Sequence, residues 1–348
     1  MNLALKVGIV RDVRYLEHKP GIVHPESPNR LRSLYRMLDK DFVDRVITIE
    51  PEMATLEQLE QVHTPGYVKQ ILSTAGRDFT TLAPDTPVSA NTYIAAWLAA
   101  GGCIKAMDAL LTDECRVCFA MVRPPGHHAL RDRAGGFCIF NNLGVAAKYA
   151  IKRHGIKKVL IVDWDIHHGN ALQDLFYSDN NVLYLSSHYM GWYPHTGDWE
   201  ETGEGEGTGY NVNIPVPKEL EDNDILHIYR DILTPVVRRF KPELILVAAG
   251  FDAHQRDPLG RTRLSEKAYY WLAQLVLQLA DAAKGAPLLF SLEGGYDLWA
   301  LVNSVREVLN VLTFDGRRGR IPLVSTRVGR EVVERARQVH AKYGVWTS

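Results

Sequence analysis

Asp163, Asp165 and His167 occupy alternate positions in the segment VDWDIHHGN, directly after a short apolar run. Alternate side chains of an extended strand project to one face, so we expect these three on the same face if the strand continues through them. Asp252, in AAGFDAHQRDP, can add a carboxylate from a neighbouring strand end. Carboxylates buried beside an imidazole are costly to desolvate without a cation. Two aspartates, one histidine and an open position suit a catalytic zinc ion, or iron(II), whereas a carboxylate network in a loop or at a helix N-terminus is the alternative.

His127 and His128 follow the rigid stretch Arg-Pro-Pro-Gly in VRPPGHHALRDRAGGFCIFNN. A zinc ion with two anionic ligands acidifies its bound water less than one held by neutral histidines, so such a site needs a separate base. One histidine could take the proton of the water, and the other could protonate the leaving group. Asp163 and Asn170 are suited to hydrogen-bond the outer imidazole nitrogens. Taken alone, an adjacent histidine pair in a loop is more often simply solvated.

Tyr296 lies in the EGGY turn and is a candidate hydroxyl donor. The carbonyl oxygen of an amide becomes an oxyanion during hydrolysis, and a donor placed there stabilises it. A buried structural tyrosine is the alternative for this residue by itself. Together with the aspartates and histidines, it predicts metal-assisted amide hydrolysis.

These residues share one feature of placement, because each group follows an apolar strand. The strands CFAMV, VLIV, ELILVAAG and PLLFSLE precede the polar clusters 123–128, 163–170, 251–257 and 294–297. In open parallel sheets, ligands bind beyond the carboxyl ends of the strands. We therefore expect an α/β fold in which a mainly parallel sheet, flanked by helices on both faces, brings the four clusters to one edge.

The periodicity of apolar residues predicts the individual elements. Strands are expected at 7–10, 117–122, 158–162, 182–185, 244–248 and 287–291. Helices are expected at 142–154, closed by Gly155, and at 265–284, with Ser265 as N-cap. Thr55 and Gln58 have the spacing of a capping box, and REVVERARQVHAKYG predicts an amphipathic helix near the C-terminus.

Composition restricts the classes of function. The 348 residues carry 40 Lys+Arg and 41 Asp+Glu, which indicates no nucleic-acid surface. The longest nearly apolar run, 93–104, is shorter than the roughly 18 residues of a membrane span, and no secretory signal is evident, so we expect a cytoplasmic protein without a membrane partner. Four cysteines are too few for a disulfide scaffold, and the pair Cys115 and Cys118 is interpreted as part of a buried strand rather than a metal or redox motif.

Two other signatures do not support their usual function. GEGEGTG at 203–209 has glutamates that would repel phosphate and does not match the dinucleotide fingerprint. No G-x-S-x-G nucleophile elbow is present, so a serine hydrolase is not indicated.

Seven motifs resemble the histone deacetylase and acetylpolyamine amidohydrolase superfamily. They are HPESPNRL (24–31), VHTPGYV (62–68), RPPGHHA (123–129), GGFCIFNN (135–142), DWDIHHGN (163–170), AGFDAHQRDPLG (249–260) and LEGGYD (292–297). The similarity covers most of residues 1–315, which we expect to be one catalytic domain, with 316–348 as a helical extension packed on it. Asn170 and LEGGY resemble class II enzymes and their bacterial relatives.

The resemblance implies the arginase–deacetylase fold, deacylation of an acylated amine and a role for each matched residue. It makes Asp165, His167 and Asp252 the ligands of a single zinc ion. It makes His127 and His128 the acid–base pair and Tyr296 the group that polarises the carbonyl.

The resemblance also implies substrate contacts and a second cation. Phe137 and Tyr193 resemble walls of the acyl-lysine tunnel, and the Gly136 carbonyl and Asp85 would hold the substrate amide or backbone. Family members bind structural potassium near residues that correspond here to Asp163, Asp165, His167 and Ser186.

Some positions depart from the family pattern. His195 stands where many relatives have glycine, so the tunnel rim is expected to be narrower or differently charged. Some polyamine deacetylases also have Pro-His in this loop, but Leu259 replaces the acidic gatekeeper of that branch. Ureohydrolases of the same fold bind two manganese ions and need aspartates where this chain has Gly169 and His254, so one metal is expected.

The sequence therefore predicts a zinc-dependent hydrolase that removes acetyl or longer acyl groups from acyl-lysine in proteins or peptides. The main alternative is an acetylpolyamine deacetylase acting on small acetylated amines. A non-catalytic module that binds acyl-lysine is a third hypothesis, and a homo-oligomer is left open.

Overall fold

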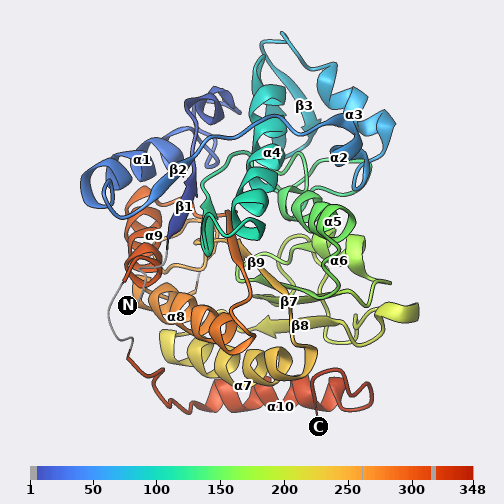
Figure 1. Cartoon of the computed structure of the whole chain (residues 1–348), viewed down its shortest axis with the longest axis vertical. Coiled ribbons are helices and arrows are strands. Elements are labelled where there is room, and N and C mark those ends of the chain that lie inside the picture. Colours follow the sequence, from blue (N-terminus) through green and yellow to red (C-terminus); the bar gives the residue numbers. More distant parts are fainter. Residues whose placement is uncertain (1–5, 261, 315–318, 348) are drawn as a thin grey trace.

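An eight-stranded sheet forms the centre of the computed structural model, which describes residues 6–260, 262–314 and 319–347 (Figure 1). The strand order is β2-β1-β5-β10-β9-β6-β7-β8, and every neighbouring pair is parallel. The strands are β1 (Val7–Val10), β2 (Ile47–Ile49), β5 (Val117–Ala120), β6 (Val159–Asp163), β7 (Val182–Tyr189), β8 (Asn211–Val216), β9 (Leu244–Ala249) and β10 (Leu288–Leu292). A separate antiparallel hairpin pairs β3 (Thr80–Ala83) with β4 (Thr86–Val88).

Helices cover both faces of this sheet, which explains why its inner strands are almost entirely buried. One layer contains α1 (Asn29–Asp41), α9 (Leu298–Leu312), α8 (Glu266–Ala282) and α7 (Asp222–Phe240). The other contains α4 (Thr92–Leu111), α5 (Asn142–His154) and α6 (Asn170–Phe176) (Figure 1). The short elements η1 (Val13–Glu17), α2 (Leu56–Glu60), α3 (Pro65–Leu72) and η2 (Gly205–Gly207) lie in the connections. The predicted fold class is confirmed.

The predicted elements are confirmed, with ends that shift by a few residues. All six predicted strands are present, and β7 runs four residues beyond the expected end. Gly155 closes α5 in the left-handed conformation at φ 70°. Ser265 caps α8, and the Thr55–Gln58 capping box opens α2.

Helix α4 is longer than the apolar run seen in the sequence. By length and composition it could cross a membrane, yet 78% of its most apolar window is buried within the protein. A side chain at Gly101 would collide with the backbone of Glu52, so the helix packs tightly against its neighbours. These are the features of a core helix.

The predicted C-terminal helix is α10 (Arg327–His340), which packs along α7 (Figure 1). Val332, Ala336 and Trp346 join the same hydrophobic core as the sheet. The predicted domain boundary at 315/316 lies outside the described residues.

All four cysteines are buried and free. Cys118 lies within β5, whereas Cys115 precedes the strand, and both side chains pack in the core.

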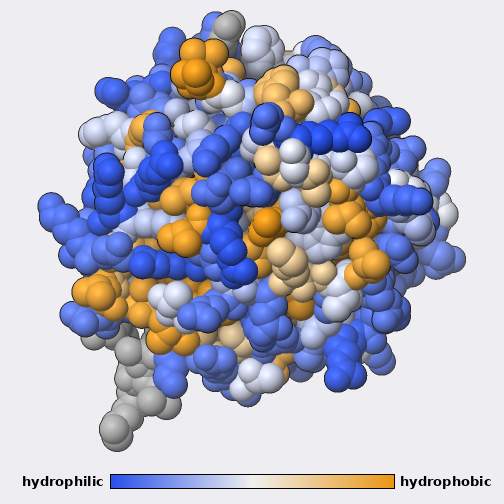
Figure 2. Space-filling model, turned by 90° about the horizontal axis from the view of Figure 1, so that it is seen from above, coloured by the Kyte–Doolittle hydropathy of each residue, from blue (hydrophilic) through white to orange (hydrophobic). Residues whose placement is uncertain are grey.

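The outer surface mixes residue types. Figure 2 shows hydrophobic side chains in patches separated by hydrophilic ones on the face seen from above. Apolar atoms contribute a large share of the surface of any folded protein.

Candidate active site

The carboxyl ends of four adjacent central strands, β5, β10, β9 and β6, carry the polar clusters that the sequence singled out. Each cluster comes from a different part of the chain, and the parallel sheet brings them to one edge. The predicted convergence is therefore present.

Asp165, His167 and Asp252 form a compact buried group whose potential ligand atoms all lie within 4.8 Å of one another. His167 Nδ1 is 3.1 Å from Asp165 Oδ1 and 2.9 Å from Asp252 Oδ2. One nitrogen and two carboxylates converge here, which is the donor set predicted for a metal ion.

The local backbone that builds this group differs from the expected extended strand. β6 ends at Asp163, and the chain then bends. Asp163 Oδ1 accepts the N–H of Asp165, and Asp165 Oδ1 accepts the N–H of His167. Such bonds to the backbone two residues on are typical of Asx turns. The shared face was expected only if the strand continued through His167, and that condition is not met because β6 ends at Asp163. Asp163 faces His127 instead.

Because Gly250 and Gly294 have no side chains, there is room beside them for the carboxylates of Asp165 and Asp252. A Cβ at Gly250 would collide with the side chain of Asp165, and one at Gly294 would collide with Asp252 and Asp165. The N–H of Gly294 also donates to Asp165 Oδ2 at 2.8 Å. This cradle, together with the N,O,O donor set, fits a divalent metal ion.

The electrostatics of the group show how strongly negative it is. Burial raises the pKa of Asp252 to about 7, and the charge of Asp165 adds to the effect. Burial opposes charge on His167, but Asp252 and Asp165 outweigh it and raise its pKa to about 10. A positive charge is therefore favoured at this position, whether a proton or a cation supplies it.

The tandem histidines stand beside this group, with ring centroids 3.9 Å apart. His127 Nδ1 is 3.2 Å from Asp163 Oδ2, and His128 Nδ1 is 2.8 Å from Asn170 Oδ1. Tyr184 donates its hydroxyl to the same Asp163 oxygen at 2.9 Å. Each imidazole thus has one nitrogen engaged by the partner that the sequence indicated.

The surroundings of His127 and His128 shift the pKa values of the two imidazoles in opposite directions. Burial disfavours charge on His127, but the carboxylates of Asp165 and Asp163 prevail and raise its pKa to about 10. Burial and the neighbouring His127 and His167 hold the pKa of His128 well below its ordinary value. Groups whose pKa values are pushed apart in this way are suited to opposite roles in proton transfer.

A cavity of about 180 Å³ leads to these groups. It is lined by Asp85, His128, Gly136, Phe137, His167, Trp192, Tyr193, Leu259 and Tyr296. Tyr193 lies edge-on to His128, with ring centroids 5.0 Å apart, and Phe137 lies edge-on to Tyr296 at 5.7 Å. The predicted wall residues therefore face the cavity.

The predicted backbone-binding residues lie at the same cavity. Asp85 Oδ2 accepts the N–H of Gly136 at 3.0 Å, and its Oδ1 accepts the hydroxyl of Thr86 at 2.8 Å. A Cβ at Gly136, whose φ is 54°, would collide with the ring of His128. Asp85 thus supports the loop that carries Gly136 and Phe137.

Tyr296 completes the cavity from the turn after β10. Its backbone N–H donates to Asp257 Oδ2 at 2.6 Å, and the guanidinium of Arg30 lies 5.1 Å from its ring centroid. Burial and the charge of Asp252 raise the pKa of its phenol well above the ordinary value, so the hydroxyl keeps its proton. A protonated phenol can donate a hydrogen bond.

Comparison with known proteins agrees with this geometry. The family model of the histone deacetylase domain matches residues 24–312. The chain belongs to the histone deacetylase family. This membership supports a hydrolase that acts as a deacetylase, and it confirms the resemblance seen in the motifs.

Similar proteins come from distant organisms. A "probable deacetylase" of Archaeoglobus fulgidus is 38% identical over 84% of this chain and 81% of its own length. "Histone deacetylase 10, chloroplastic" of Oryza sativa subsp. japonica is 33% identical over 98% of this chain and 84% of its own. The crystal structure of the HDA15 HD domain superposes with a TM-score of 0.90 at 34% identity, covering 98% of this chain and 96% of that one. The match to that structure supports the arginase–deacetylase fold.

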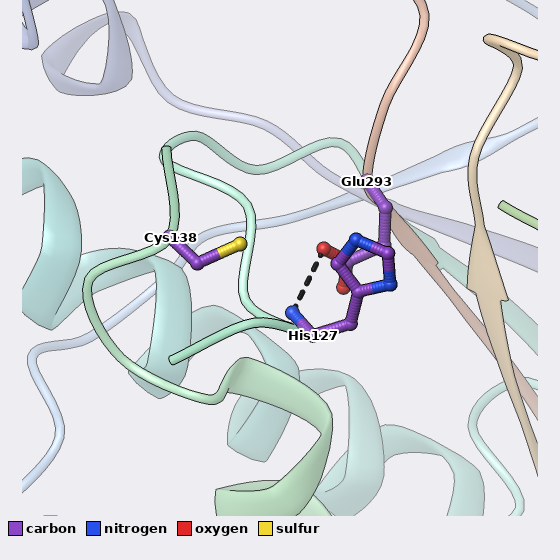
Figure 3. Close-up of side chains that lie close together, drawn as sticks. All are labelled: His127, Cys138 and Glu293. Carbon is purple, nitrogen blue, oxygen red and sulfur yellow. Dashed lines mark hydrogen bonds between the residues drawn. The ribbon is translucent and has the colours of Figure 1, made fainter. Parts of the chain in front are cut away.

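Three further residues of this deacetylase-family site received no role from the sequence. Asp257 accepts the N–H groups of Tyr296 and Asp297. Glu293 and Cys138 form a second buried group with His127, whose potential ligand atoms also lie within 4.8 Å of one another (Figure 3). All three lie within the matched motifs, which was the available signal, but nothing in their spacing shows which groups they contact.

Ser186 pairs with Asp163 across the β6–β7 ladder, and both are buried. Two of the four residues that the resemblance assigned to a potassium ion, Asp163 and Ser186, are thus neighbours on adjacent strands.

Proposed function

We propose that this protein is a zinc-dependent amidohydrolase that removes acetyl or longer acyl groups from the ε-amine of lysine in proteins or peptides. The observation that carries the proposal is the Asp165–His167–Asp252 group at the cavity, with His127, His128 and Tyr296 beside it. Metal ligands, proton-transfer groups and an oxyanion donor within one site form a complete set for amide hydrolysis.

Asp165, His167 and Asp252 would hold the metal ion, and their ligand types suit zinc or iron(II). A zinc ion supplies Lewis acidity towards the carbonyl and lowers the pKa of water. The other steps of the reaction would be carried out by side chains of the protein.

His127 and His128 would move the protons. One accepts the proton of the attacking water, and the other protonates the departing amine. Asp163 and Asn170 hold the two rings through their Nδ1 atoms, which leaves the Nε2 atoms to take part in the proposed proton transfers. Tyr296 would donate its hydroxyl to the carbonyl oxygen as negative charge develops there.

The shape of the cavity favours acyl-lysine. Phe137 and Tyr193 present aromatic walls, which suit the four methylenes of a lysine side chain. Leu259 at the cavity is apolar, so it offers no carboxylate to a second amine of a polyamine. Acetylpolyamine remains the second candidate because of Pro194 and His195, but His195 is exposed and its Nδ1 lies 3.1 Å from the Gly191 carbonyl.

We include in this proposal a structural potassium ion near Asp163 and Ser186, which are buried and paired across β6 and β7. Such an ion would offset negative charge behind the catalytic group. It would bind in addition to the single catalytic metal.

The experiment is an assay of purified protein, stripped with a chelator and reloaded with zinc or iron(II). Substrates are lysine peptides with acetyl to decanoyl groups and acetylspermidine. We expect release of the acid from acyl-lysine peptides, loss of that release on stripping, and recovery on reloading. Faster turnover of acetylspermidine than of any peptide would favour the polyamine alternative. Zinc-loaded protein that binds acyl peptides without hydrolysing them would favour a binding module.

A further inference from the structure

Glu293, immediately after β10, is a fully buried acid that the proposed reaction does not use. Its Oε2 accepts the backbone N–H of Gly126 at 2.7 Å and that of His127 at 3.1 Å. Figure 3 shows the carboxylate lying against His127, with the bond to the backbone nitrogen drawn. One side-chain oxygen thus holds two consecutive amides of the loop that carries both histidines.

These amides need such an acceptor because of the local sequence. Pro124 and Pro125 have no N–H, so they cannot anchor the loop by donating hydrogen bonds. Gly126 and His127 are buried and belong to neither helix nor strand, so no regular ladder receives their N–H groups. A buried N–H without a partner costs free energy comparable to a lost hydrogen bond. By accepting the N–H groups of Gly126 and His127, Glu293 avoids this cost for both residues.

The other side of the loop is equally constrained. Asn142 Nδ2 donates to the Pro124 carbonyl at 3.1 Å. A Cβ at Gly126 would lie 2.6 Å from the nitrogen of Asn142 and 2.9 Å from the Phe140 carbonyl oxygen, so the backbones touch there. The loop is therefore held between the start of α5 and Glu293, with little room to shift.

The group of His127, Cys138 and Glu293 could also be interpreted as a second metal site. Each member, however, already has another partner. His127 Nδ1 faces Asp163, and Cys138 Sγ donates to the Gly136 carbonyl at 3.4 Å and receives a backbone hydrogen bond from His128. Burial raises the pKa of the Cys138 thiol, which opposes the thiolate that a metal needs. These contacts favour a hydrogen-bonded support for the histidine backbone.

We propose that Glu293 is a positioning residue for the acid–base pair: its carboxyl group fixes the backbone of Gly126 and His127 and so sets where the imidazoles of His127 and His128 stand. This inference rests on the proposed function, because it assigns the two histidines to proton transfer. A displacement of about 1 Å in such a group can cost about 10²-fold in rate.

The test compares Glu293→Gln with Glu293→Met. Glutamine keeps an acceptor oxygen for the two amides, whereas methionine keeps similar length and volume without one. Burial also raises the pKa of Glu293 to about 7, so a carboxamide resembles the protonated form of the native group. The Gln variant is therefore the matched control.

We expect Glu293→Met to lower kcat on an acetyl-lysine peptide by roughly 10–100-fold with KM within about twofold, and Glu293→Gln to stay within about threefold of the parent. Both variants should keep one zinc per chain, and circular dichroism should show that both are folded. A Met variant with the parent kcat would overturn the proposal. So would an equal loss in the Gln variant, because charge rather than the acceptor would then matter. If the parent binds two zinc ions per chain and either variant binds only one, the proposal would be overturned in favour of a second metal site.

Hydrogen exchange supplies a readout that does not depend on activity. A peptide spanning 122–130 should exchange faster in the Met variant than in the Gln variant or the parent. Equal protection in all three would overturn the proposed support. If the zinc-loaded parent lacks deacylase activity but this exchange pattern holds, the proposed function fails while the contact between Glu293 and the loop is upheld.

Discussion

Tyr296 lines the cavity, Asp257 accepts its backbone N–H, and the guanidinium of Arg30 lies over its ring. Removing the hydroxyl deletes a donor without removing the ring. We expect Tyr296→Phe to lower kcat by roughly 10²–10³, which is the usual loss for one oxyanion donor.

Tyr193→Phe is the control for this prediction, because Tyr193 lines the same cavity but is expected to act only as a wall. Steady-state kinetics on an acetyl-lysine peptide should show kcat within a few-fold of the parent for that variant. Parent-like turnover by the Tyr296 variant would remove Tyr296 from the chemistry.

The two partners of the tandem histidines could also be predicted from residue types, although not which histidine each partner would meet. Asp163 and Asn170 are both in one short motif, and the structure places them on His127 and His128 respectively. Glu293 could not be assigned in the same way. Its partners are backbone amides 166 and 167 positions away, and the side-chain pattern of a sequence does not show which buried N–H groups lack acceptors.

At the scale of the elements, the loops after β6, β9 and β10 must approach one another closely for the Asp165–His167–Asp252 group to form. Gly250, directly after β9, leaves no room for a side chain beside Asp165. We expect Gly250→Ala to weaken zinc affinity by about 10-fold or more, since groups that orient metal ligands typically contribute 10–100-fold.

Competition with a fluorescent zinc chelator measures this effect. Gly66→Ala is the control, because nothing lies within 4 Å of a Cβ built at Gly66 in α3. Unchanged affinity in the Gly250 variant would mean that the loop can adjust, contrary to this account.

Strands with regular apolar runs were the elements most readily predicted. β8 was not predicted, because its sequence NVNIPV contains two asparagines and a proline. In the structure the Nδ2 groups of Asn211 and Asn213 both donate to Gln173 Oε1, which gives these buried donors an acceptor inside the protein. Pro215 is tolerated because β8 is an edge strand. Helix α7 was missed as well, since Pro235 and several charges interrupt its apolar pattern.

At the scale of the whole molecule, the C-terminal segment is part of the packed structure. His340 of α10 is buried and has ring contacts with Tyr343 and Trp346, and neither ring nitrogen has a recorded partner. Burial, with a smaller effect of Lys342, lowers its pKa to about 4.

Stability should therefore depend on pH through His340. Between pH 6.5 and about 4, the unfolded chain protonates this histidine and the folded protein does not, so stability falls as pH falls through that window. We expect His340→Phe to reduce the difference in free energy of unfolding between pH 7 and pH 5 by about 1–2 kcal/mol.

Urea denaturation at the two pH values measures this difference. His195→Gln is the control, because His195 is exposed and should leave the parent difference intact. His63 and His188 also have pKa values lowered to about 4, mainly by burial, so some pH dependence should persist in every variant. A parent-like difference in the His340 variant would show that the histidine titrates alike in both states.

The sequence by itself determined the layer architecture and the chemical types at the site, because apolar strands followed by polar clusters can be seen in the order of residues alone. Only the tertiary structure decided that β5, β10, β9 and β6 are neighbours, and that Asp165 and His167 turn towards Asp252 while Asp163 turns towards His127. The physical reason is that strand order and the turns after each strand depend on packing and backbone hydrogen bonds between segments far apart in the chain. The residue pattern within one segment does not indicate which distant segments it will contact.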